Sequence, residues 1–183
     1  MLDTIAAGRI GDIRSVRVTH AKLLPERLRG WRLSDAPGAG VVQDVATHDF
    51  SVVNALVAPR VADEVVAIGT RQGDWKAGSD DAAMAVVRYG DVLVSTHDGF
   101  TTPHGASGVE VLGSRGALWG EDLTSQDPVA RVYLTDDNGK AELEVDRTDL
   151  YLRTVTAFVR AVIGDGRPIV TGEDALAAAR IAM

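Results

Sequence analysis

A carboxylate and an imidazole stand four residues apart at the start of a predicted helix. Residues 38–49 read GAGVVQDVATHD and run from a glycine-rich turn into an apolar, helix-like stretch. Residues four apart lie on the same face of a helix, so Asp44 and His48 can both point at one small ligand. An imidazole exchanges a proton near neutral pH, and a carboxylate can hold it in orientation. The pair predicts chemistry on a hydroxyl or a carbonyl group.

The same spacing also has a structural interpretation, which is the better one when the spacing is considered alone. Asp44 would complement the positive end of the helix, and His48 would be a core histidine with satisfied ring nitrogens. Asp49 points about 100° away from His48 in a regular helix. We expect Asp49 to be solvated or structurally hydrogen-bonded.

No nucleotide-binding motif accompanies the pair. The chain has no GxGxxG loop after a strand and no P-loop. The sequence is therefore expected to hold only part of an active site.

Bulk composition excludes several classes of protein. The 183 residues are 45% hydrophobic, which predicts one domain over residues 1–183. A net charge of −7 without a run of Lys or Arg argues against nucleic acid as a partner. The absence of cysteine excludes disulfides and thiolate metal sites and fits a cytoplasmic location. No apolar run approaches the roughly 20 residues of a membrane span, and no signal peptide is visible.

Hydrophobic periodicity predicts strands and helices in a definite order. A strand is expected over 13–22, then a long loop over 23–40 and the helix 41–58, which Pro59 ends. Strands follow at 61–70, 82–89, 92–96, 109–113, 117–119, 129–134 and 141–145, and helices at 150–163 and 173–182.

The short turns between these strands, which include an Asn-Gly signal at 138–139, predict antiparallel neighbours. Thr171, with Asp174 three residues on, predicts a capping box at the start of the last helix. The order indicates an α+β fold, an open, mostly antiparallel sheet with helices on one face. The other face is then uncovered, and we expect it to mediate a homodimer or homotetramer.

Four segments together resemble the C-terminal domain of the glucose–fructose oxidoreductase / inositol dehydrogenase / MocA family. Residues 8–13 resemble its G-x-I-G lead into the first strand, and residues 38–49 its glycine-rich turn and D-x-x-x-H helix. Residues 109–118 resemble its hairpin I-x-G-x-x-G-x-L, and residues 158–175 its closing helices. The resemblance covers nearly the whole chain in order.

The resemblance implies a fold like the C-terminal domain of glyceraldehyde-3-phosphate dehydrogenase and an NAD(P)-dependent dehydrogenase acting on a sugar, polyol or related alcohol. His48 would exchange a proton with the substrate hydroxyl, while Asp44 would bind a neighbouring hydroxyl or orient the imidazole. NAD or NADP would be bound mainly by a Rossmann domain that this chain lacks. The family's active-site lysine, in an E-K-P segment of that domain, would be absent with it. The chain would be a fragment, a trimmed form or a stand-alone relative.

Other polar residues are candidates for substrate binding. Lys22 and Trp31 lie at the strand end and in the long loop, where Trp31 could stack on a sugar ring. His97 and Thr101 belong to a polar patch after a predicted strand. Each set also has a structural interpretation, as a loop anchor or a solvated loop.

Three functions follow from these observations. The first is the substrate-binding and oligomerising domain of a dehydrogenase, inactive as an isolated chain. The second is a non-catalytic binding or assembly module that self-associates through its sheet. The third, a metal-dependent hydrolase or isomerase using Asp44, His48, His97 and His104, has no supporting ligand spacing, so no metal is expected.

Overall fold

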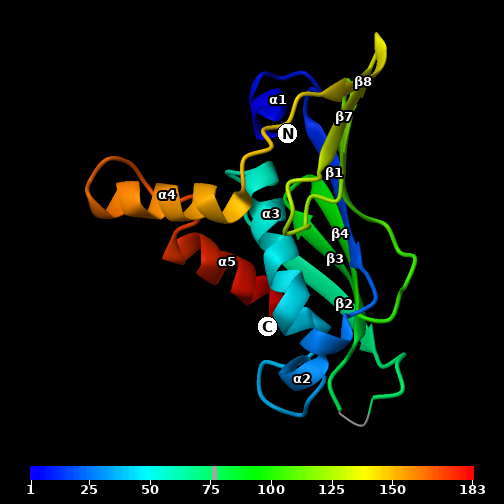
Figure 1. Cartoon of the computed structure of the whole chain (residues 1–183). Helices are drawn as coiled ribbons and strands as arrows, with labels where there is room; N and C mark the ends of the chain where they lie inside the picture. Colours follow the sequence, from blue (N-terminus) through cyan, green and yellow to red (C-terminus); the bar gives the residue numbers. More distant parts are fainter. Residues whose placement is uncertain (76–77) are drawn as a thin grey trace.

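A single mixed sheet forms the body of the molecule in the computed structural model, which describes residues 1–75 and 78–183 (Figure 1). Within these residues eight strands lie in the order β2-β3-β4-β1-β5-β6-β7-β8. Their bounds are β1 Ile13–Ala21, β2 Glu64–Thr70, β3 Ala82–Tyr89, β4 Val92–Gly99, β5 Ser107–Gly113, β6 Ala117–Glu121, β7 Arg131–Asp136 and β8 Gly139–Leu143.

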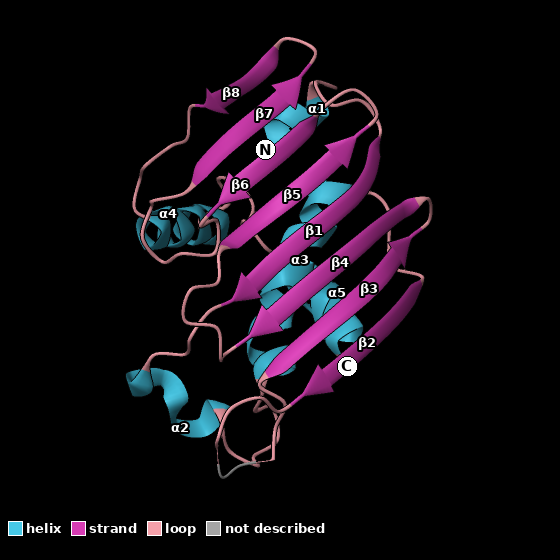
Figure 2. Cartoon of the chain, turned by 90° about the vertical axis from the view of Figure 1, so that its right-hand side faces the viewer, coloured by secondary structure: helices cyan, strands magenta, loops and turns pink. Residues whose placement is uncertain are grey.

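The helices gather on one side of this sheet, and Figure 2 shows the strands in front of them from the other side. Helix α3 packs against α5 over the sheet, whereas α4 projects away from it. The α+β fold with an open sheet is thereby confirmed. The bounds are α1 Leu2–Ala6, η1 Glu26–Leu28, α2 Arg29–Arg32, η2 Val42–Ala46, α3 Thr47–Val57, α4 Leu150–Val162 and α5 Gly172–Ala182.

The first strand occupies the middle of the sheet and makes a parallel pair that the turn pattern did not predict. β1 runs parallel to β4, with His20 opposite Asp98, and antiparallel to β5. Parallel neighbours need a long crossover, and here it contains α3, β2 and β3. Short-turn reasoning describes only strands that follow one another, so it could not detect this pair.

Several element bounds differ from the expected ones for a physical reason. β4 continues to Gly99 instead of ending at Thr96, because the polar Thr96 and Asp98 are buried on the helix side of the sheet. The loop expected over 23–40 contains the short helices η1 and α2. The last hairpin turns at Asp137 and Asn138, so β7 and β8 lie about two residues from their expected positions.

The core lies between the sheet and α3. Alternate residues of the central strands face the helix, as strand geometry requires. The helix contributes apolar residues at helical spacing. Buried members of this core include Val16, Val18, Val92, Val94, Val109, Val111, Phe50, Val53 and Val57.

A glycine fixes where the site-bearing helix begins. Gly40 has a φ of +92°, and a Cβ there would lie 3.0 Å from the carbonyl oxygen of Asp80. The next residue, Val41, donates its backbone N–H to that same oxygen at 2.9 Å. A side chain at position 40 would therefore displace η2 from the strand connection on which it rests.

The last helix carries the expected N-terminal cap. The Thr171 hydroxyl accepts from the Asp174 N–H at 3.2 Å, and the Asp174 carboxylate accepts from the Thr171 N–H at 2.9 Å. This reciprocal arrangement is a capping box, as the sequence predicted.

Replacing Thr171 with alanine should lower the free energy of unfolding by about 1 kcal/mol, because helix N–H groups lose their acceptor. Urea unfolding followed by circular dichroism measures this loss. Thr156→Ala, in the exposed middle of α4, is the matched control and should change stability by less than about 0.5 kcal/mol. Equal losses in the two variants would contradict the capping role.

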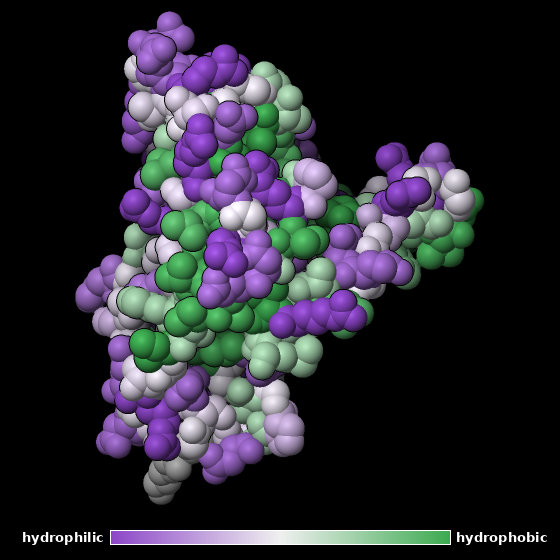
Figure 3. Space-filling model, turned by 180° about the vertical axis from the view of Figure 1, so that it is seen from behind, coloured by the Kyte–Doolittle hydropathy of each residue, from purple (hydrophilic) through white to green (hydrophobic). Residues whose placement is uncertain are grey.

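Apolar side chains also lie on the surface. Figure 3 shows hydrophobic areas on the body and on the projecting arm formed by α4. The exposed apolar residues of α4 include Leu152, Val155, Phe158, Val159 and Val162. None of the helices in the described ranges is long and apolar enough to cross a bilayer.

Candidate functional site

The Asp44–His48 segment spans the junction of η2 and α3, on the helix-bearing side of the sheet. Asp44 is partly buried, and His48 is exposed in the first turn of α3. The guanidinium of Arg32 donates from Nε to Asp44 Oδ2 at 2.7 Å. This ion pair fixes the orientation of the Asp44 carboxylate, which lies four residues before the exposed imidazole of His48.

Trp31 joins this group through its neighbour. The Arg32 guanidinium carbon lies 4.8 Å from the centroid of the Trp31 ring, and the indole is about half exposed. Trp31, Arg32 and Asp44 thus form a continuous set of contacts from the loop to the helix. An exposed aromatic face next to charged hydrogen-bonding groups suits a sugar, which offers an apolar ring face and a hydroxyl edge.

Lys22 lies directly after β1 and is engaged elsewhere. Its Nζ donates to Asp122 Oδ1 at 2.9 Å, across to the end of β6. Both side chains are close to half exposed. Lys22 therefore anchors one sheet end, and its recorded contact is with Asp122 and not with Asp44 or His48.

The structure does not bring His97 and Thr101 to this group. Along β4, Thr96 and Asp98 face the helices, so the alternation of the strand points His97 to the opposite side. His97 there lines an apolar groove with Ile68 and Met84. The Thr101 hydroxyl donates to Gln72 Oε1 at 2.7 Å. The sequence pattern favours a loop for this polar patch. In the structure, residues 96–98 continue β4, and their side chains alternate between the two faces of the sheet.

A buried polar cluster beneath α3 was not selected from the sequence. His20 Nδ1 lies 3.1 Å from Asp49 Oδ1, and the exposed fraction of the Asp49 side chain is 0%. Asp98 is 1% exposed and stands opposite His20 in the β1–β4 register. Asp49 is thus hydrogen-bonded within the structure, one of its two expected states. The alternation of Val16, Val18 and His20 was the signal that could have placed this ring under the helix.

Burial changes the protonation of this cluster. Desolvation is the largest cause that raises the pKa of Asp98 to about 8, followed by a hydrogen bond with Asp49 and by the charge of Asp49. The Thr96 hydroxyl has a smaller effect in the opposite direction. Two adjacent buried carboxyl groups avoid carrying two charges, so Asp98 is mainly protonated at neutral pH.

Metal binding was the third alternative, built on Asp44, His48, His97 and His104. In residues 1–75 and 78–183, no three His, Asp or Glu side chains converge to hold a metal ion. His97 also lies on the opposite face of the sheet from Asp44 and His48.

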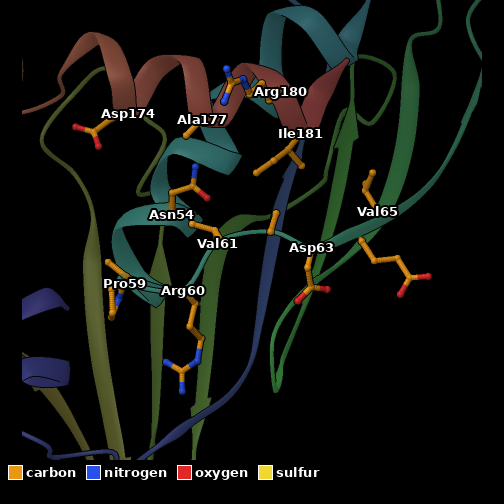
Figure 4. Close-up of a pocket in the computed structure, with 13 residues that line it drawn as sticks. Asn54, Pro59, Arg60, Val61, Asp63, Val65, Asp174, Ala177, Arg180 and Ile181 are labelled. Atoms are coloured by element: carbon orange, nitrogen blue, oxygen red, sulfur yellow. The ribbon is translucent and has the colours of Figure 1, made fainter.

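A surface groove of about 540 Å³ lies away from this site, between the end of α3, the start of β2, and α5 (Figure 4). Three of its charged groups are engaged within the protein. Arg60 donates to Asp91 at 3.0 Å, Asp63 accepts from Arg88 at 2.7 Å, and Asp174 caps α5. Neither Asp44 nor His48 lines this groove, so the candidate site is the exposed surface at the start of α3.

Comparison with known proteins gives this arrangement a family context. A sequence profile of the GFO/IDH/MocA C-terminal domain matches residues 1–119. The 1,5-anhydro-D-fructose reductase of Ensifer adhaerens is 40% identical over 176 residues, which is 95% of this chain and 53% of the reductase.

Solved structures share the fold at low identity. The aldose-aldose oxidoreductase of Caulobacter crescentus, complexed with glycerol, has a TM-score of 0.84 at 18% identity over 98% of this chain and 54% of its own. A 3-ketoreductase of Actinomadura kijaniata, in complex with NADP and TDP-benzene, has a TM-score of 0.82 at 19% identity over 99% and 55%. This chain therefore spans about half the length of the relatives that it matches.

Proposed function

Because this chain belongs to the GFO/IDH/MocA family as a C-terminal domain, we propose that it is the substrate-binding domain of an NAD(P)-dependent oxidoreductase acting on a sugar, polyol or related alcohol. The observation that carries this proposal is the exposed His48 four residues after Asp44, which is ion-paired with Arg32. The reductase from Ensifer adhaerens, a sugar-ketone enzyme by its name, supports the substrate class.

Each side chain has a definite task in this proposal. His48 gives a proton to the carbonyl oxygen of a ketone during reduction, or takes it from the hydroxyl during oxidation. Asp44, held in place by its ion pair with Arg32, accepts a hydrogen bond from a neighbouring substrate hydroxyl. Trp31 packs against the apolar face of the sugar ring. Lys22, His97 and Thr101 have no task at this site.

The cofactor would come from a dinucleotide-binding domain outside these residues. A nicotinamide, when bound, supplies or accepts the hydride at the substrate carbon. The fold relative from Actinomadura kijaniata binds NADP, which supports a nicotinamide without choosing between NAD and NADP. We propose that an NAD or NADP molecule approaches the start of α3, where His48 is accessible.

Cofactor oxidation measured at 340 nm tests this function. The chain joined to a dinucleotide-binding domain of the family should oxidise NADH or NADPH in the presence of 1,5-anhydro-D-fructose or a related sugar ketone. The 183-residue chain alone should show no such activity. Robust activity of the isolated chain, or an inactive joined protein across a panel of sugars and polyols, would overturn the proposal.

Self-association through the uncovered sheet face is the second part of the proposal, and it also serves the alternative of a non-catalytic assembly module. Ile68 is 76% exposed at the edge of the sheet, and apolar neighbours surround it on the same face. Apolar patches of this kind commonly mark protein interfaces. The exposed apolar residues here are Val66, Ile68, Met84, Val86 and Leu93. We propose a second copy of the chain as the occupant, in a homodimer or homotetramer.

Replacing Ile68 with aspartate should convert the oligomer into a monomer at micromolar concentration, because two copies would bury unpaired carboxylates. Sedimentation velocity measures the outcome, and circular dichroism confirms that the variant is folded. Val129→Asp, an exposed apolar residue between β6 and β7, is the control and should leave the assembly unchanged. A monomeric parent protein would refute the interface.

A further inference from the structure

The buried carboxyl groups under the candidate site have an unusual hydrogen-bond requirement. Among the described residues, Asp49 Oδ2, Asp98 Oδ1 and Thr96 Oγ1 are buried without a recorded hydrogen-bond partner. Two ionised carboxylates would leave acceptors unsatisfied next to one another, which is costly in the interior. A single proton between them removes one charge and provides the missing donor.

The third member of the cluster is an imidazole whose orientation depends on this proton. An ionised Asp49 can only accept, so the contact at 3.1 Å makes His20 Nδ1 the donor. Nε2 is then unprotonated when the ring is neutral. The His20 side chain is 23% exposed, so the ring is not wholly enclosed. Asp49 also follows His48 directly, so the bond ties β1 to the first turn of α3.

Resting on the proposed function, we propose that Asp49 and Asp98 are positioning residues: Asp98 shares its proton with Asp49, and Asp49 holds His20 in one tautomer beside the His48 turn. The protein then holds a second imidazole in a fixed orientation beneath the first turn of α3. The raised pKa of Asp98 agrees with this arrangement, because it keeps the shared proton in place at neutral pH.

Other groups around the cluster do not supply an alternative proton donor. On β5, the Ser107 hydroxyl is within 2.7 Å of the Thr124 hydroxyl. At the end of β1, Lys22 is paired with Asp122, and on η2, Asp44 is paired with Arg32. The Thr96 hydroxyl on β4 lowers the pKa of Asp98, but desolvation and Asp49 outweigh this effect.

Nitrogen-15 NMR of the 183-residue chain at pH 7.5 tests this inference, because the sequence contains only four histidines to assign. The neutral His20 ring should be more than about nine-tenths in the Nδ1–H tautomer, against the Nε2–H form that free imidazole side chains prefer. Asp49→Leu should shift His20 to the Nε2–H form. Asp98→Asn should keep the Nδ1–H form, because its amide donates to Asp49 as the protonated carboxyl does.

A matched control separates this effect from simple loss of a buried carboxylate. Asp81 is also fully buried, but it accepts from the backbone of Gln72 and Gly73 at 2.8 Å. Asp81→Asn should leave the tautomer of His20 unchanged. A parent chain with His20 in the Nε2–H form would overturn the inference, even if Asp49→Leu does not fold.

Kinetics of the joined enzyme provide the second readout. Asp49→Leu should lower kcat/KM by about tenfold or more, whereas Asp81→Asn, at a buried carboxylate outside the cluster, should leave it unchanged. If the NMR result holds and no substrate is turned over, the proposed function fails and the positioning of His20 stands. If the joined enzyme turns over substrate while NMR shows His20 in no single tautomer, only the positioning role of Asp49 and Asp98 fails.

Discussion

Replacing His48 with alanine should reduce kcat of the joined enzyme by roughly 10²–10⁴-fold, the range that one general acid–base group usually contributes. The side chain is exposed at the start of α3, so its removal opens no cavity in the core. The free energy of unfolding should therefore change by less than about 0.5 kcal/mol. This combination distinguishes a chemical role from the alternative interpretation of His48 as a core histidine.

Steady-state kinetics with saturating cofactor and sugar ketone, together with urea unfolding, measure both quantities. His104→Ala is the matched control, since His104 is an exposed histidine between β4 and β5. It should change neither kcat nor stability appreciably. A His48→Ala enzyme with at least half of the parent kcat would remove His48 from the chemistry.

The second large effect concerns the dependence of stability on pH. The folded-state pKa of Asp98 is raised from 3.8 to about 8. Between these values the folded protein keeps a proton that the unfolded chain has released. The contribution of Asp98 to the free energy of unfolding is therefore greatest at low pH. It declines as pH rises towards 8, by at most about 1.4 kcal/mol per pH unit. Above pH 8 the group ionises in the folded protein and the decline ends.

Asp98→Asn should abolish this decline, because its side chain stays neutral at every pH. Urea unfolding at pH 5, 6, 7 and 8 gives the difference in stability between variant and parent. The free energy of unfolding of the variant, relative to that of the parent, should increase by several kcal/mol from pH 5 to pH 8. Asp81→Asn again serves as the control. A difference that is constant with pH would show that Asp98 is ionised throughout this range.

Hydrophobic periodicity and turn chemistry predicted the local elements well. The Asn-Gly turn, the capping box at Thr171 and the apolar face of α3 each depend on residues close together in the sequence. The open sheet with helices on one face then followed from the order of the elements. The family resemblance, which the profile over residues 1–119 confirms, added the context of the Asp44–His48 segment.

The contacts that complete the site depend on pairings that the sequence does not display. The Arg32–Asp44 ion pair joins α2 to η2, and the His20–Asp49 bond joins β1 to α3. His97 could be placed on the outer face only once β4 was known to continue through the polar residues 96–98. Polar residues at strand ends resemble loops in sequence, and only a partner strand reveals that they are paired.

The central position of β1 has a consequence for how the protein acquires its structure. One flank of β1 pairs with residues 93–99 and the other with residues 107–113, so both neighbours lie far along the chain. Bringing such distant segments together costs loop-closure entropy before any contact compensates for it, which makes folding slow. During synthesis, His20 can meet Asp98 only after about eighty further residues have been added. The inner part of the candidate site should therefore be among the last features to form, and refolding should recover secondary structure before it restores the tautomer of His20.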